Sequence, residues 1–268
     1  MVQRYKNYFI IRNFVKNFIL YTLYFILFFV PLHPIMACIL HIETSTDVCS
    51  VAVSRNGDCL FDRVEQGDGR GSQASEKIGS MIDEALACVE SYGIKPDAVA
   101  VSSGPGSYTG LRIGVSMAKG IAYASDAKLI AVPTLKILVN GLPTLNLKPS
   151  TLFCPMIDAR RMEVFAAVYD ENLNEVRPVG ADIVDADTYR EYLDNGEVWF
   201  FGNGAAKCMP VISHPNARYI PDVQPLARNM ISLAEQLYAQ GSFEDVAYFT
   251  PAYLKEYQAK LPKKLLKA

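Results

Sequence analysis

The sequence has few residues that could build a metal or redox centre. It contains three histidines, and none of them lies beside a carboxylate or a cysteine at the spacing of metal ligands. Its six cysteines form no CxxC pair and are scattered through apolar stretches, which is typical of reduced core cysteines in a cytoplasmic protein. We therefore expect no metal site, no firmly bound cofactor and a cytoplasmic location.

The usual nucleotide and nucleophile motifs are also missing. There is no nucleophile elbow of the form Gly-x-Ser-x-Gly, and no P-loop, because Thr109-Gly110 is followed by Leu111-Arg112. A dinucleotide fingerprint would need a third glycine where Thr109 stands. What the chain does have is a strand–loop–helix pattern over residues 98–122, with the sequence AVAVSSGPGSYTGLRIGVSMAKGIA.

The loop of this pattern allows two interpretations. Backbone N–H groups at the start of a helix are suited to bind phosphate, and Arg112 could grip an anion there. Alternatively, the loop is purely structural or forms an interface, and the arginine is solvated or ion-paired. The candidate nucleotide or anion residues are Gly104, Gly106, Ser107, Thr109, Gly110 and Arg112. Ser107 or Thr109 is the predicted N-cap of the helix.

Residues 1–35 differ from the rest of the chain. They carry four basic residues, no acid and the apolar run Phe18–Leu32. Basic and apolar regions in this order are typical of a signal peptide or a short anchor, and residues 35–38 resemble a lipoprotein cleavage box. However, the run is shorter than the ~20 residues of a spanning helix, and the first strand follows Met36 directly. We therefore interpret Met36 as the true start and residues 1–35 as an upstream segment outside the mature protein.

Without that segment the chain is acidic. Removing its four basic residues from the 26 leaves 22, against 28 acidic residues, a net charge of −6. An acidic body is a poor electrostatic match for nucleic acid unless a local basic patch is present. The lysine-rich tail from Lys255 to Lys267 is the patch that the sequence shows, and we interpret it as a solvated end of the chain.

The order of elements predicts an α/β protein of two related domains. Residues 38–65 read as three antiparallel strands, with a hairpin turn at Asn56-Gly57. Helices and strands then alternate to residue 140, and the order βββαβαβα is that of a ribonuclease-H-like domain. Residues 141–268, beginning with a Pro- and Gly-containing link, open on a second hairpin with an acid at its turn. We expect two ribonuclease-H-like domains in tandem, 36–140 and 141–268, as in actin-like ATPases.

Two helices of the first domain carry packable faces. The helix predicted over residues 75–92 has an apolar face. The helix over residues 110–122, after the loop, has a face of small residues spaced by four. Such faces serve either the protein's own core or a partner that approaches closely. The predicted partner-interface residues are Ile78, Met81, Ile82, Ala85, Gly114, Ala118 and Ala122.

Four segments together identify a resemblance to a known family. They are ILHIETST (39–46), GPGSYTGLRIG (104–114), VPTL (132–135) and IDAR (157–160). The run of Gly-Pro-Gly-Ser, an aromatic residue, Thr and Gly is specific, and with the others it resembles the TsaB family. The resemblance runs from Met36 to about Leu254. That family is the dimerisation subunit of the bacterial complex that makes threonylcarbamoyladenosine in tRNA, beside the anticodon.

The resemblance implies a scaffold with no catalytic residues of its own. The paralogous subunit TsaD would be the heterodimer partner and would carry out the transfer, with ATP and a metal ion bound in the partner subunits. The ATPase TsaE would join the complex, and tRNA would be reached only through it. Self-association of the isolated chain is left open. The family's first strand commonly ends in Asp, whereas this chain has Glu43, which favours a turn-capping role for that acid.

Two other functions remain as alternatives. One is a nucleotide-dependent kinase or ATPase that uses Glu43, the Gly104–Gly110 loop and Gly202–Gly204. The other is a membrane-attached lipoprotein, which rests entirely on residues 1–38. If Met36 is the start, we expect no membrane contact.

Overall fold

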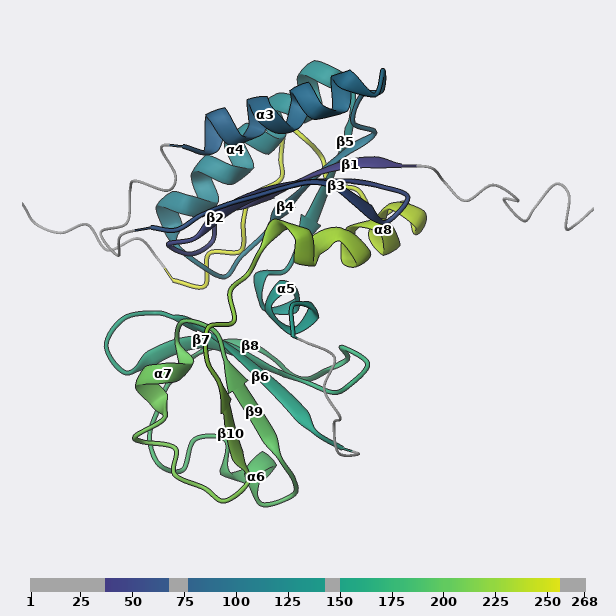
Figure 1. Ribbon diagram of the computed structural model, residues 1–268. Coiled ribbons are helices and arrows are strands. Elements are labelled where there is room, and N and C mark those ends of the chain that lie inside the picture. Colours follow the sequence, from purple (N-terminus) through teal and green to yellow (C-terminus); the bar gives the residue numbers. More distant parts are fainter. Residues whose placement is uncertain (1–36, 68–76, 143–149, 256–268) are drawn as a thin grey trace, which may run out of the picture. The chain divides into compact units, whose positions relative to one another are not determined.

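The computed structural model describes residues 37–67, 77–142 and 150–255. They form two five-stranded sheets, ordered β3-β2-β1-β4-β5 and β10-β9-β6-β7-β8 (Figure 1). From its other edge, the second order is β8-β7-β6-β9-β10, so each strand has a counterpart in the first sheet. This shared arrangement confirms the prediction of two ribonuclease-H-like folds in tandem. The proposed upstream segment 1–35 and the tail beyond Lys255 lie outside the described residues.

The first sheet holds the loop singled out above. Strand β1 pairs antiparallel with β2 and parallel with β4, which places Glu43 beside Ser102 at the carboxyl end of the sheet. The turn between β2 and β3 has positive φ at Asn56 and Gly57, as its sequence predicts. The elements are β1 (Cys38–Glu43), β2 (Cys49–Arg55), β3 (Asp58–Glu65), α3 (Ile78–Ser91), β4 (Ala98–Ser102), α4 (Tyr108–Ser125), β5 (Lys128–Val132) and α5 (Thr134–Asn140).

The second sheet repeats this pairing with smaller helices. Strand β6 pairs antiparallel with β7 and parallel with β9. Its elements are β6 (Leu152–Asp158), β7 (Glu163–Tyr169), β8 (Glu175–Ile183), α6 (Arg190–Leu193), β9 (Val198–Phe201), α7 (Ala205–Cys208) and β10 (Ala217–Ile220). The predicted hairpin at Asp158 is therefore present, between β6 and β7.

Both faces of the first sheet are covered by helices. Helices α3 and α4 pack on one face, where Met81, Ala85 and Ala118 join the core cluster with Leu40 and Val99. The opposite face is covered by the 3-10 turn η1 (Ala227–Met230) and α8 (Ile231–Ala239), as Figure 1 shows. The amphipathic pattern of residues 226–240, followed by Gly241, predicts a single helix, and the structure splits it into these two pieces.

The end of the described chain returns to the first sheet. The Glu244 N–H donates to the Leu129 carbonyl at 2.8 Å, and the Ala252 N–H donates to the Ser103 carbonyl at 2.8 Å. The Lys119 ammonium of α4 donates to the carbonyl of Ala247 at 2.9 Å. The division at residue 140 stays a prediction. Residues 227–254, which it assigns to the second domain, contact the first sheet.

Cys38 bears on the lipoprotein alternative. Its side chain is 3% exposed and belongs to the core cluster, and burial raises the pKa of its thiol to about 11. A diacylglycerol on this sulfur would have to displace core side chains, which argues against lipid attachment at this cysteine. Within the described ranges, no helix combines the length and apolar character needed to cross a membrane.

A closed glycine loop as the candidate functional site

The loop between β4 and α4 is closed by the turn that follows β1. The Ser107 N–H donates to the Ser45 carbonyl at 2.7 Å, and the Thr44 hydroxyl donates to the Gly110 carbonyl at 2.8 Å. Thr44 and Ser45 are both buried. The space in front of the loop, where a phosphate would have to bind, is therefore occupied by the chain's own backbone.

The glycines of α4 permit this close approach. A Cβ atom on Gly110 would overlap the carbonyl oxygen of Thr44, and one on Gly114 would overlap the Thr44 hydroxyl. A Cβ on Gly106 would overlap the backbone of Ser45. The small face predicted for α4 is thus used within the chain, where it seats the residues after β1.

Glu43 ends β1 beneath this closed turn. Its side chain is fully buried, and its Oε1 accepts a hydrogen bond from the Ser45 N–H at 2.6 Å. Burial raises the pKa of Glu43 to about 7, although the neighbouring Ser45 and Ser102 favour its ionised form. The other oxygen, Oε2, makes no hydrogen bond of normal length and angle. This geometry supports the turn-capping role and leaves the carboxylate out of reach of a bound nucleotide.

The remaining loop residues have structural partners. Ser107 is the N-cap of α4 and accepts from the Gly110 N–H at 3.3 Å, as predicted. The exposed Arg112 lies over the Tyr108 ring, 5.5 Å from its centroid, and Tyr253 packs on the same ring at 4.9 Å. Gly104 is buried next to the Ala252 carbonyl, and Thr109 is exposed in the first turn of the helix. The phosphate-binding interpretation of this loop stays a prediction, and the closed geometry does not favour it.

The predicted partner-interface residues lie in the buried core of the first domain. Each of them is buried in the chain's own core: Ile78, Met81, Ile82, Ala85, Gly114, Ala118 and Ala122. An amphipathic helix buries its apolar stripe against the sheet that it covers, so these side chains cannot contact a second protein while the fold is intact. The assignment of these residues to the interface stays a prediction, and their burial in the chain's own core does not favour it.

A different row of residues, here called the outward face of α4, is only partly buried at the edge of the core. Ile113, Met117 and Ile121 are partly buried, packed at the edge of the core, and spaced by four residues. Gly120 lies beside them, and a Cβ atom there would meet nothing within 4 Å. The spacing was visible in the sequence, but without the sheet it could not be decided which of two stripes on α4 faces inward.

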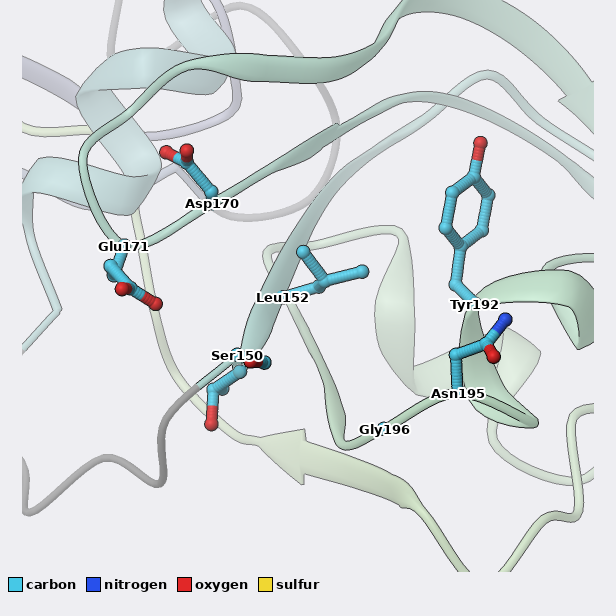
Figure 2. A pocket seen from close by; sticks show the side chains of 8 residues that line it. Ser150, Leu152, Asp170, Glu171, Tyr192, Asn195 and Gly196 are labelled. Atoms are coloured by element: carbon cyan, nitrogen blue, oxygen red, sulfur yellow. The ribbon is translucent and has the colours of Figure 1, made fainter.

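The second sheet carries a hollow of about 370 Å³. Figure 2 shows Asp170 and Glu171 on one side of it, Tyr192 and Asn195 on the other, and Leu152 between them. The Asp170 carboxylate already accepts from the backbone N–H groups of Asn172 and Asn174, each at 2.9 Å. The two carboxylates in its lining make this hollow electrostatically unfavourable for a phosphate. Across the described ranges, no three His, Cys, Asp or Glu side chains are grouped to hold a metal ion.

Comparisons with known proteins show which proteins this chain resembles. The family model for TsaD, tRNA N6-adenosine threonylcarbamoyltransferase, matches residues 71–263. The chain is 28% identical over 237 residues to the TsaB protein of Escherichia coli K12, a tRNA threonylcarbamoyladenosine biosynthesis protein; the match covers 84% of this chain and 99% of that protein. It is 30% identical over 209 residues to a tRNA N6-adenosine threonylcarbamoyltransferase of Pediococcus pentosaceus, with 61% of each chain covered.

A solved structure supports the fold. A Pseudomonas aeruginosa crystal structure, described as an uncharacterized protein with similarity to peptidase YeaZ, superposes with a TM-score of 0.65 at 24% identity. The superposition covers 82% of this chain and all of that one. The chain therefore belongs to the family of the tRNA N6-adenosine threonylcarbamoyltransferases and, within it, to the TsaB proteins.

Proposed function

We propose that this chain is a non-catalytic subunit that binds and activates a TsaD-type transferase for the formation of threonylcarbamoyladenosine in tRNA. Its similarity to TsaB proteins and to the transferases themselves supports a role in this modification. The observation that carries the binding role is the outward face of α4, defined by Ile113, Met117, Gly120 and Ile121.

Gly120 is the most informative residue of this outward face. A glycine inside a helix costs about 1 kcal/mol relative to alanine, so it needs a reason in packing or function. Gly110 and Gly114 have that reason within the chain, because Thr44 lies against them. Gly120 is exposed and has no such neighbour. A partner helix that approaches α4 closely would supply the missing reason.

The closed loop supports the non-catalytic part of the proposal. A nucleotide would have to displace the turn at Thr44 and Ser45, whose hydrogen bonds to the loop are already made. We therefore assign ATP and the metal ion to the partner subunits, including a TsaE-type ATPase. Within this assembly the present chain would act in the cytoplasm.

The substitution Gly120→Arg tests the proposed surface. Arginine is a good helix former and position 120 has free space, so we expect the isolated variant to be folded and at least as stable as the parent. Binding to the TsaD-type paralogue of the same cell should fall by at least about 30-fold, roughly 2 kcal/mol, as at an interface hot spot. Calorimetric titration of one purified protein with the other measures this loss.

Ala239→Arg provides the matched control. This residue is also small, helical and exposed, but it lies on α8, on the opposite face of the first sheet. Its partner affinity should equal that of the parent chain. A folded Gly120→Arg variant that binds the paralogue as tightly as Ala239→Arg would refute the assignment of the outward face.

The ATPase alternative has its own measurement. We expect the isolated chain, titrated with ATP and Mg²⁺, to show no binding tighter than a dissociation constant of about 100 μM, or roughly −5.5 kcal/mol. The physical reason is the closed loop above Glu43, in which the Ser45, Ser107 and Gly110 N–H groups already donate within the chain. Tighter binding with turnover would favour the kinase or ATPase function instead.

A further inference from the structure

The turn between β6 and β7 has two arginines where its backbone favours other residues. Arg160 and Arg161 have φ values of 70° and 50°, and the Ala159 N–H donates to the Glu163 carbonyl at 3.0 Å. Two successive residues at positive φ are typical of tight hairpin turns, in which Asn-Gly is preferred. A side chain with a Cβ atom is sterically disfavoured in this left-handed region. The turn itself gives no reason for either arginine.

The turn is held by neighbouring groups that do not involve the guanidinium groups. The Asp158 Oδ1 accepts from the Arg160 backbone N–H at 2.9 Å and also pairs with the Lys207 ammonium. Lys207 donates in addition to the Glu163 carbonyl at 2.6 Å. These interactions hold the backbone of the hairpin tip, so its geometry does not depend on the side chains of the two arginines.

Both arginine side chains are left for a ligand. They are exposed, and neither guanidinium has an ion pair or hydrogen bond with any residue that the structure describes. Lys207 and Lys255 flank them and are paired with Asp158 and Glu163 respectively, so the group holds four cations and two carboxylates. The whole chain has a net charge of −2. This tip is a local positive site on an acidic protein.

We propose that Arg160 and Arg161 bind backbone phosphates of the tRNA on which the assembly acts. This inference rests on the proposed function, and it adds a direct contact between this chain and the RNA. A guanidinium binds a phosphate through two parallel N–H···O bonds, and two neighbouring arginines on a rigid tip can each take one phosphate. The local positive charge also offsets the repulsion between an acidic chain and a polyanion.

The double substitution Arg160→Asn with Arg161→Gly separates function from stability. Asn-Gly suits the two backbone conformations, so we expect the variant to fold and to unfold at a higher urea concentration than the parent. In a reconstituted complex with the TsaD-type paralogue, its affinity for tRNA at low salt should fall about tenfold. The slope of log affinity against log salt should become shallower by about 1.5, because each lost phosphate contact contributes about 0.7–0.9.

The control removes the same charge elsewhere. The double substitution Lys95→Asn with Lys128→Asn changes two exposed lysines of the first domain, one before β4 and one at the start of β5. It should leave the tRNA affinity and its salt slope unchanged. Equal tRNA affinities of the tip variant and this control would overturn the inference, and so would a wild-type chain that binds no tRNA with or without the paralogue. If the tip variant loses the paralogue while the free chain keeps its tRNA affinity, the tip contacts protein and the inference is wrong.

The proposed function is tested by a separate measurement. Co-elution of the wild-type chain with the paralogue tests it without reference to RNA. Should that complex fail to form, the proposed function fails, and tRNA binding is then compared between wild-type and tip-variant chains alone. A tenfold difference there would still support the arginine tip.

Discussion

Glu43→Gln is expected to make the protein more stable at pH 8 by about 3 kcal/mol and to leave its stability at pH 4 nearly unchanged. Burial raises the pKa of Glu43 from 4.5 to about 7 in the folded protein. Between these values the folded state holds a proton that the unfolded state has lost, so the free energy of unfolding falls as the pH rises. A shift of this size is worth about 3 kcal/mol above pH 7.

The free energy of unfolding falls with rising pH because burial disfavours the ionised form of Glu43 in the folded protein. The contribution of Glu43 to stability is fully present below pH 4.5 and is lost as the pH rises through 7. Glutamine is neutral throughout, and its carbonyl can still accept from the Ser45 N–H. Urea unfolding at a series of pH values measures the effect. Glu90→Gln, an exposed acid on α3, serves as the control, and a Glu43→Gln variant with the same pH slope as this control and the parent would contradict the explanation.

Gly110→Ala is expected to destabilise the protein by about 3 kcal/mol, although alanine is the better helix former. The new methyl group would overlap the Thr44 carbonyl, and that backbone is held by the Thr44 hydroxyl and by Ser107 on Ser45. Neither side can move without breaking these hydrogen bonds, so the cost is that of overpacking a rigid site. Thermal or urea unfolding measures the loss.

Gly120→Ala is the matched control in the same helix. Its methyl group meets nothing within 4 Å, so we expect a gain of about 0.5–1 kcal/mol from helix propensity alone. The same Gly→Ala change is thus expected to lower the free energy of unfolding at position 110 and to raise it at position 120. Equal effects at the two positions would mean that the turn after β1 does not hold the loop closed.

Much of the fold could be predicted because local signals agreed with it. The Asn56-Gly57 turn, the three-strand opening and the repeat of that opening at Asp158 are all present. Strand β8 was not predicted, because it is largely exposed and contains Pro178 and Gly180, so it lacks the alternation of a half-buried strand. Strand β10, only four residues long, carries too short a pattern to be recognised.

The site was harder to predict than the fold. Periodicity shows that a helix has an apolar stripe, but it does not show what covers that stripe. Ile82 and Ala118 therefore looked suited to a partner, whereas the sheet covers them. The closing of the loop depends on Thr44, which lies 66 residues before Gly110 and has no local signature. Arg160 and Arg161 were visible in the sequence, but their unfavourable backbone conformation was not.

The return of residues 227–254 to the first sheet has a consequence for synthesis. Helix α8 supplies Met230 and Ala234 to one face of that sheet, and the Ala247 carbonyl binds Lys119 of α4. The ribosome makes these residues after both sheets, so the first sheet stays incompletely covered until residues 227–254 have also been made. A product truncated before residue 227 exposes one apolar side of its central strands, which marks it for chaperones and proteases.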